Sequence, residues 1–201
     1  MEVLWIALVL AVVAVVAGIV VLAVRSERRR SARVDDVWRA FAAEHDLQWK
    51  PERGPWWHRR AGEAQGAVGD APFTLERVYV STGKSRITYT NLRSQLARPL
   101  GERVLVSRRS WLGRLGTAFC GPIVELGSSA FDARWLVRSR SRDAARGLLG
   151  EDVRNALLDF PRCARIEARG TNLRLYWRHP ERDPRVLARG LEIVRAAVST
   201  A

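Results

Sequence analysis

Residues 73–91, FTLERVYVSTGKSRITYTN, decide the fold class of this chain. The first half of this stretch alternates between two sets of side chains, with Phe73 and Leu75 in one set, as a strand with one buried face requires. Residues 81–84 supply a turn, and residues 85–91 return with a similar alternation. The stretch therefore predicts an antiparallel β-hairpin.

The sequence after this hairpin predicts more strands, followed by helices. Strands are expected at residues 103–107, 123–126 and 131–138, and a second hairpin is expected over residues 165–177. Helices are expected at residues 144–149, at residues 151–160 and after Asp183-Pro184. Because strands and helices do not alternate along the chain, we expect an α+β fold in which helices cover an antiparallel sheet.

Toward the N-terminus, residues 3–24 contain no charged side chain. As a helix this run is about 33 Å long at about 1.5 Å per residue, enough to cross a ~30 Å hydrocarbon core. A cleaved signal peptide is the competing interpretation. However, the run exceeds the roughly 7–15 apolar residues of such peptides, and no Lys or Arg precedes it. The sequence therefore predicts a transmembrane helix over residues 1–24.

Basic residues follow the apolar run immediately, at Arg25, Arg28, Arg29, Arg30 and Arg33. Since basic flanks stay on the cytoplasmic side, the N-terminus is expected outside the cell. The sequence thus predicts a single-pass protein of the bacterial inner (cytoplasmic) membrane, with residues 25–201 in the cytoplasm. Within that part, we expect a basic juxtamembrane segment and linker helix at 25–46 and a cytosolic α+β domain at 47–201.

The net charge of +13 fits either a solvated basic surface with a basic membrane flank or a surface that binds an anionic partner. Two groups of arginines are candidates for a surface that contacts lipid or a partner protein: Arg103, Arg108, Arg109 and Arg114, and then Arg134, Arg138, Arg140, Arg142 and Arg146. Nucleic acid is a less favoured partner, because the sequence has no zinc-finger spacing, no RNP-like aromatic motif and no convincing helix-turn-helix.

The C-terminal part carries a pattern of FD-x-x-aromatic (from Phe131), D-x-x-AR-x-LL (from Asp143) and VR-x-x-LL (from Val153). With the hairpin and helix that follow, this pattern resembles one in uncharacterised bacterial single-pass membrane-anchored proteins, a domain of unknown function. The resemblance covers roughly the last 75 residues. It implies the architecture and a membrane anchor, and it implies no activity.

Motifs for catalysis are incomplete. Gly83-Lys84-Ser85 ends like a phosphate-binding loop, but Val78 stands where that loop requires glycine, so a hairpin turn is favoured. Cys163 and His179 are conceivable as nucleophile and base, although a buried structural thiol is the simpler interpretation. No spacing of His and Cys fits a zinc site, and no G-x-S-x-G elbow is present.

These observations favour a basic binding or scaffolding domain that contacts anionic lipid headgroups or a membrane-protein partner. We expect no cofactor, no metal site and no catalytic residues. The alternative is a membrane-tethered enzyme whose site cannot be recognised from one sequence.

Overall fold

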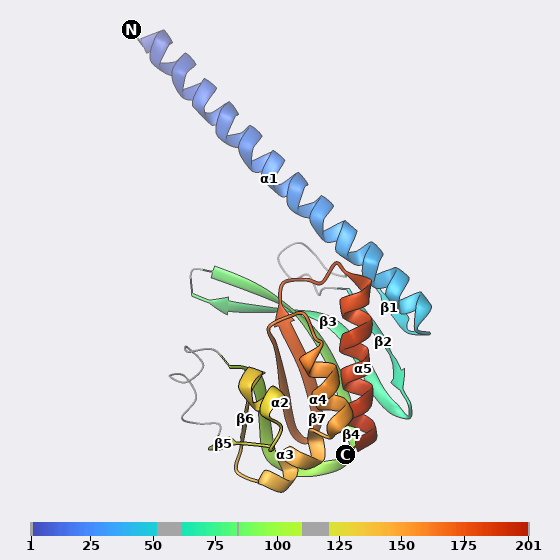
Figure 1. Ribbon diagram of the computed structural model, residues 1–201. Coiled ribbons are helices and arrows are strands. Elements are labelled where there is room, and N and C mark those ends of the chain that lie inside the picture. The colour runs from blue at the N-terminus through green and yellow to red at the C-terminus, as the bar shows by residue number, and fades with distance from the viewer. Residues whose placement is uncertain (1, 52–61, 84, 110–120, 201) are drawn as a thin grey trace. The chain divides into compact units, whose positions relative to one another are not determined.

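The computed structural model describes residues 2–51, 62–83, 85–109 and 121–200. The chain divides into two compact units, Met1–Asp36 and Val37–Ala201, which are described separately (Figure 1). The first unit holds most of helix α1 (Glu2–Glu44). The second holds the end of α1 together with the strands and the other helices of the described residues.

The N-terminal apolar run belongs to α1, which continues without interruption into the charged residues that follow. Within the part of the chain that the structure describes, no helix offers an apolar stretch long enough to cross a membrane. The prediction of a transmembrane helix over residues 1–24 is therefore wrong by this finding.

The predicted localisation depended on that helix. That localisation was a single-pass protein of the bacterial inner membrane, with its N-terminus outside and residues 25–201 in the cytoplasm. It requires a membrane span, so it is contradicted as well. The arginines that were expected to flank the span belong to α1, where Arg25, Arg29 and Arg33 are exposed.

The second unit is built on an antiparallel sheet. Its described strands follow the order β1-β2-β3-β4-β6-β5, and β7 pairs with β4 beside this path. The strands are β1 (Gln48–Lys50), β2 (Glu63–Val68), β3 (Ala71–Thr82), β4 (Ser85–Arg108), β5 (Ile123–Val124), β6 (Trp135–Ser139) and β7 (Ala164–Arg178). The predicted first hairpin is β3 with the start of β4, in register from Phe73 opposite Ser94 to Thr82 opposite Ser85. Gly83, at φ 67°, makes the turn.

Strands β4 and β7 are longer than the sequence analysis expected. The strands predicted at 85–91 and 103–107 are two parts of β4, and the second hairpin predicted over 165–177 is the single strand β7. The hairpin prediction is wrong because residues on both sides of Gly170 pair with β4, not with each other.

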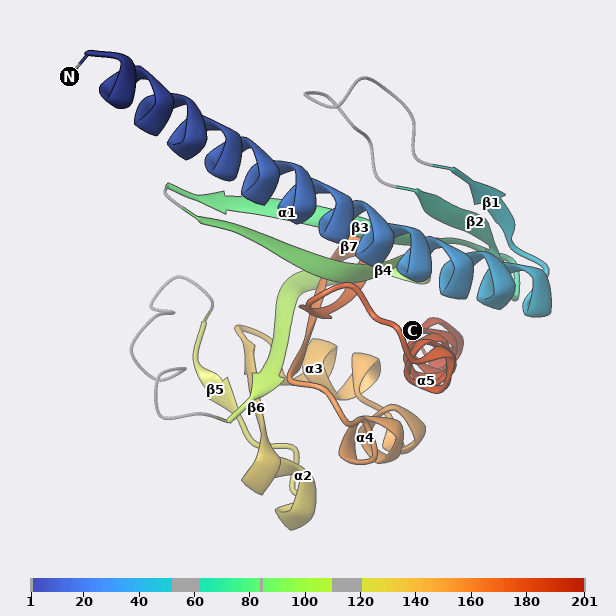
Figure 2. The same cartoon turned by 90° about the horizontal axis from the view of Figure 1, so that it is seen from above.

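In the described part of the second unit, four helices accompany the end of α1: α2 (Ser129–Arg134), α3 (Arg142–Leu148), α4 (Glu151–Leu158) and α5 (Pro184–Thr200). Figure 2 shows α3, α4 and α5 on the same side of β4 and β7. The side chain of Ser141 caps α3 by accepting from the Ala144 amide at 3.1 Å, and Pro184 opens α5 after Asp183. Residues 131–134, predicted as strand, instead complete α2.

The core lies between the sheet and these helices. Trp38, Trp135 and Trp177 are at most 2% exposed, and they dominate it together with Phe73 and Phe131. On α5, Leu187, Leu191 and Val194 are buried, which matches the face expected from their spacing. Gly190 lets α5 approach the sheet closely, since a Cβ there would lie 3.2 Å from side-chain atoms of both Leu92 and Trp177.

Candidate functional site

An irregularity in the pairing of β4 with β7 creates a basic concavity. Gln95 pairs with Asn172 and Val104 pairs with Ala168, so β4 has more residues than β7 between these two pairs. The extra residues of β4 therefore bulge at the point where both strands bend. Gly170 allows the matching distortion in β7, with a φ of 56° that favours glycine.

This distortion changes which side chains share a face of the sheet. Ala168 and Leu173 are both buried, although strict alternation would place residues five apart on opposite faces. Consequently Arg169 and Arg174 also share a face, which is the exposed one. The bulge therefore brings together arginines that a regular strand would separate.

We call the resulting concavity the arginine groove. It is open, and its volume is about 920 Å³. Its lining residues are Leu100, Gly101, Glu102, Arg103, Arg140, Glu167, Arg169, Gly170, Asn172 and Arg174. Four arginines against two glutamates give this lining a net charge of +2.

Among the residues that the structure describes, only Arg103 of these arginines forms an ion pair. Arg103 Nη2 lies 2.7 Å from Glu167 Oε1. For Arg140, Arg169 and Arg174, no carboxylate of the described residues lies within the 4.0 Å of an ion pair. Three guanidinium groups thus remain available to an anion from outside.

A second groove, of about 480 Å³, adjoins the first and shares Glu167 and Arg174 with it. We call it the tyrosine groove, because Tyr89 and Tyr176 line it and pack edge to face with ring centroids 6.0 Å apart. Asn91 also lines it and is 5% exposed.

Asn91 leaves one polar atom of the tyrosine groove unsatisfied. Its Nδ2 donates to Glu76 Oε1 at 2.8 Å, which fixes the orientation of the amide, since the reverse would place two oxygens against each other. In this orientation Oδ1 is buried without a hydrogen-bond partner. A buried acceptor of this kind is costly unless a donor reaches it.

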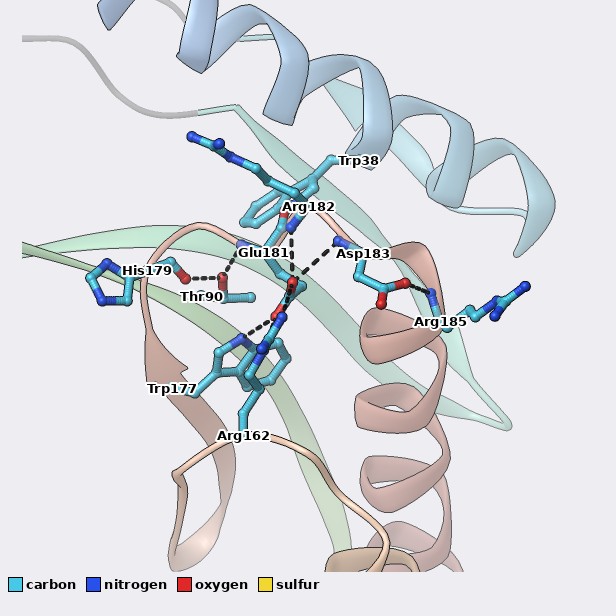
Figure 3. Close-up of polar contacts among 9 residues, drawn as sticks. All are labelled: Trp38, Thr90, Arg162, Trp177, His179, Glu181, Arg182, Asp183 and Arg185. Carbon is cyan, nitrogen blue, oxygen red and sulfur yellow. Dashed lines mark hydrogen bonds and ion pairs between the residues drawn. The ribbon is translucent and has the colours of Figure 1, made fainter.

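A contrasting polar cluster surrounds Glu181, which is 4% exposed (Figure 3). Its carboxylate accepts from Arg162 Nε at 2.9 Å and Nη2 at 3.0 Å, from Trp177 Nε1 at 3.0 Å, and from the amides of Arg182 and Asp183. Its backbone carbonyl accepts from Trp38 Nε1 at 2.9 Å. Every strong acceptor of this residue is occupied, so the cluster holds α1, β7 and α5 together and offers nothing to a ligand.

Charge in this cluster follows from its contacts. Burial alone would raise the pKa of Glu181, but the hydrogen bonds from Arg162 and from the amides of Asp183 and Arg182 outweigh it, so the pKa lies below its usual value. The hydrogen bond to Glu181 correspondingly raises the pKa of Arg162. Both groups are therefore charged at neutral pH.

The arginines proposed from the sequence do not form one surface. Arg103 and Arg140 line the arginine groove. Arg108 lies over the Trp135 ring, 5.4 Å from its centroid, and donates to the Phe160 carbonyl at 2.9 Å. Arg138 and Arg142 likewise donate to the carbonyls of Gly121 and Glu125. Three further arginines are exposed outside the groove, namely Arg109, Arg134 and Arg146, while Arg114 lies outside the described residues.

Two other sequence expectations concern catalytic chemistry. Cys163 is exposed, not buried as the structural interpretation expected. His179 has a positive φ of 70° and uses its backbone, whose carbonyl accepts from Thr90 Oγ1 at 2.8 Å. No contact between the two residues supports a nucleophile and base.

Sequence reasoning missed the groove residues on β7. Arg169, Asn172 and Arg174 were read as the polar positions of a hairpin. The available signal was the odd spacing between the apolar residues on either side of Gly170, which indicates a bulge.

No protein-family model and no curated protein matches this sequence. Among solved structures, the chain is similar to the mycobacterial trehalose monomycolate transport factor A, TtfA. The TM-score is 0.58, over 83% of this chain and 93% of the TtfA chain, at 14% sequence identity. The two proteins share a fold. At this identity the likeness describes the architecture alone.

Proposed function

We propose that this protein is a non-catalytic accessory factor that binds an anionic partner through the arginine groove. The observation that carries the proposal is the set of three guanidinium groups, of Arg140, Arg169 and Arg174, that face one concavity without a carboxylate partner in the described structure. Guanidinium groups that face one concavity can bind an anion through several charge-assisted hydrogen bonds at once.

The fold supports an accessory role over an enzymatic one. TtfA, which has a similar fold, is named as a transport factor. The grooves described here are open and lined largely by charged and polar side chains, whereas catalytic pockets are mostly apolar with a few placed polar groups. We therefore propose a transport-associated binding protein whose arginine groove binds the anionic group of a lipid, a membrane protein or a soluble molecule.

The proposal is tested by binding of the full chain to dextran sulfate, a polyanion without protein or lipid character. In the groove variant, R140E/R169E/R174E, the charge at three positions of the arginine groove is reversed. The matched control R146E/R185E/R195E makes the same change in charge at exposed positions on α3 and α5. We expect the groove variant to bind at least about tenfold more weakly than the control, because contacts to charged groups contribute about 1.5–3 kcal/mol each.

Equal losses in the two variants would contradict the proposal, because they would show that binding follows net charge alone. A loss of binding confined to the groove variant would support it, as would wild-type binding that weakens when the salt concentration rises.

A further inference from the structure

We propose that the ligand of these grooves is a phosphate ester of a hydroxylated compound, with its phosphate in the arginine groove and a hydroxyl group on Asn91 in the tyrosine groove. This inference rests on the proposed function, because it names the chemistry of the anion that the arginine groove binds. The ester is either a soluble molecule or the headgroup of a lipid.

The charge of the arginine groove fits a dianion. Its lining carries a net +2, and a phosphate monoester carries about −1.5 to −2 at neutral pH. A carboxylate offers a single charge and two oxygens, which one guanidinium satisfies in a bidentate pair. The guanidinium groups of Arg140, Arg169 and Arg174, which have no carboxylate partner among the described residues, instead match the three terminal oxygens of a phosphate monoester.

Glycines leave the backbone of the bulge open to such a ligand. Gly101 and Gly170 both line the arginine groove, and a Cβ built on either would have no heavy atom within 4 Å. Glycine within a strand often marks a place where a ligand approaches the backbone closely. The amide of Asn172 adds an uncharged donor to the same lining.

The adjoining tyrosine groove indicates what the phosphate is attached to. The two grooves share Arg174 and Glu167, so a ligand anchored in the first extends into the second. There, the buried Oδ1 of Asn91 has no hydrogen-bond partner, and the neighbouring Glu76 fixes the amide so that Oδ1 can only accept. A hydroxyl group supplies the missing donor, and the rings of Tyr89 and Tyr176 offer apolar surface to the carbon skeleton.

The test is isothermal titration of the full chain with matched probes. Inositol 1-phosphate carries both the phosphate and the hydroxyls, inorganic phosphate lacks the hydroxyls, and glucuronate replaces the phosphate by a carboxylate. We expect inositol 1-phosphate to bind at least about tenfold more tightly than glucuronate, with inorganic phosphate between them. R140A/R169A/R174A is expected to lose all three, whereas Asn91→Ala weakens inositol 1-phosphate several-fold and leaves inorganic phosphate unchanged.

The lipid source is tested by sedimentation with phosphatidylcholine vesicles, with and without phosphatidylinositol 4-phosphate, whose inositol ring carries a phosphate monoester beside free hydroxyl groups. Extra binding to phosphatidylinositol 4-phosphate that disappears in R140A/R169A/R174A assigns the ester to a lipid. Binding of the soluble probe without this difference assigns it to a soluble molecule.

The inference and the proposed function can fail separately. If glucuronate binds as tightly as inositol 1-phosphate, or if none of these probes binds while dextran sulfate still depends on the groove, the phosphate-ester ligand is wrong and the anionic partner stands. If neither the probes nor dextran sulfate depends on the groove, both proposals are overturned.

Discussion

The Glu181 cluster and the arginine groove both gather charged side chains, but they differ in how those charges are satisfied. Glu181 is 4% exposed, and its carboxylate receives five hydrogen bonds, two of them from Arg162. In the groove, Arg140, Arg169 and Arg174 share one concavity, and the described residues provide none of them with a carboxylate. The first arrangement stabilises the fold, and the second is suited to a ligand.

This difference shows why counting basic residues does not locate a site. Arg108 and Arg162 are as basic as Arg169, yet each is bound within the protein, one to the Phe160 carbonyl and the other to Glu181. The feature that separates the two regions is the presence or absence of an internal partner. The following predictions test this separation, from the largest expected effect to the smallest.

Glu181→Gln should have the largest effect on stability. The side-chain amide nitrogen that this substitution introduces would face donors in either orientation. Arg162, Trp177 and two backbone amides donate to both carboxylate oxygens of the native residue. We expect the free energy of unfolding to fall by about 3 kcal/mol, because the buried carboxylate loses hydrogen bonds from charged and neutral donors while Arg162 itself is half-exposed. Denaturant unfolding measures this loss. The control Glu192→Gln, at an exposed site on α5, should change it by less than about 0.5 kcal/mol.

Arg108→Ala should lower the free energy of unfolding by about 1.5–2.5 kcal/mol. The substitution removes the hydrogen bond to the Phe160 carbonyl and the contact with the Trp135 ring. Thermal unfolding measures the change, and Arg109→Ala, at an exposed neighbour, is the control. A loss of dextran sulfate binding with unchanged stability would instead place Arg108 in the binding surface, as the sequence analysis expected.

Acid should weaken the Glu181 cluster selectively. Because the pKa of Glu181 is lower in the folded protein than in the unfolded chain, its contribution to stability is complete above the unfolded value of about 4.3. That contribution is lost as pH falls through the lower, folded pKa. Unfolding measured between neutral pH and about pH 3 should therefore show a steeper acid loss in the wild type than in E181Q. Parallel curves would show that the cluster does not titrate in this way.

The alanine variant of the groove, R140A/R169A/R174A, should change the free energy of unfolding least. These side chains have no internal carboxylate partner in the described structure, so their removal should alter the free energy of unfolding by less than about 0.5 kcal/mol each. Denaturant unfolding checks this expectation. A loss of several kcal/mol would mean that the groove arginines stabilise the fold, and it would remove the contrast with Glu181.

The sequence predicted those parts of the fold that depend on local pattern. The alternation in residues 73–91 identified the first hairpin, and Ser141 and Asp183-Pro184 marked the starts of two helices. The groove escaped prediction because it depends on the register between β4 and β7, which are far apart in the chain. A bulge of this kind is set by long-range pairing and by Gly170, and it produces no regular pattern in the local sequence.

Two further expectations have different outcomes. The membrane helix was predicted from the length of the uncharged run at residues 3–24 and from the arginines that follow it, and it is contradicted by the described part of α1. The resemblance to membrane-anchored bacterial proteins and the domain limits at 24 and 46 stay predictions. Of the arginines chosen because they are close in sequence, only Arg103 and Arg140 line the groove, since closeness in sequence does not place side chains on one face.

The most direct test of the central claim is the titration of inositol 1-phosphate into R140A/R169A/R174A, with its unfolding measured on the same sample. Our account predicts at least about tenfold weaker binding than in the wild type, with the free energy of unfolding nearly unchanged. An unchanged affinity in a folded variant would contradict the account, because the arginine groove would then not be where the anion binds.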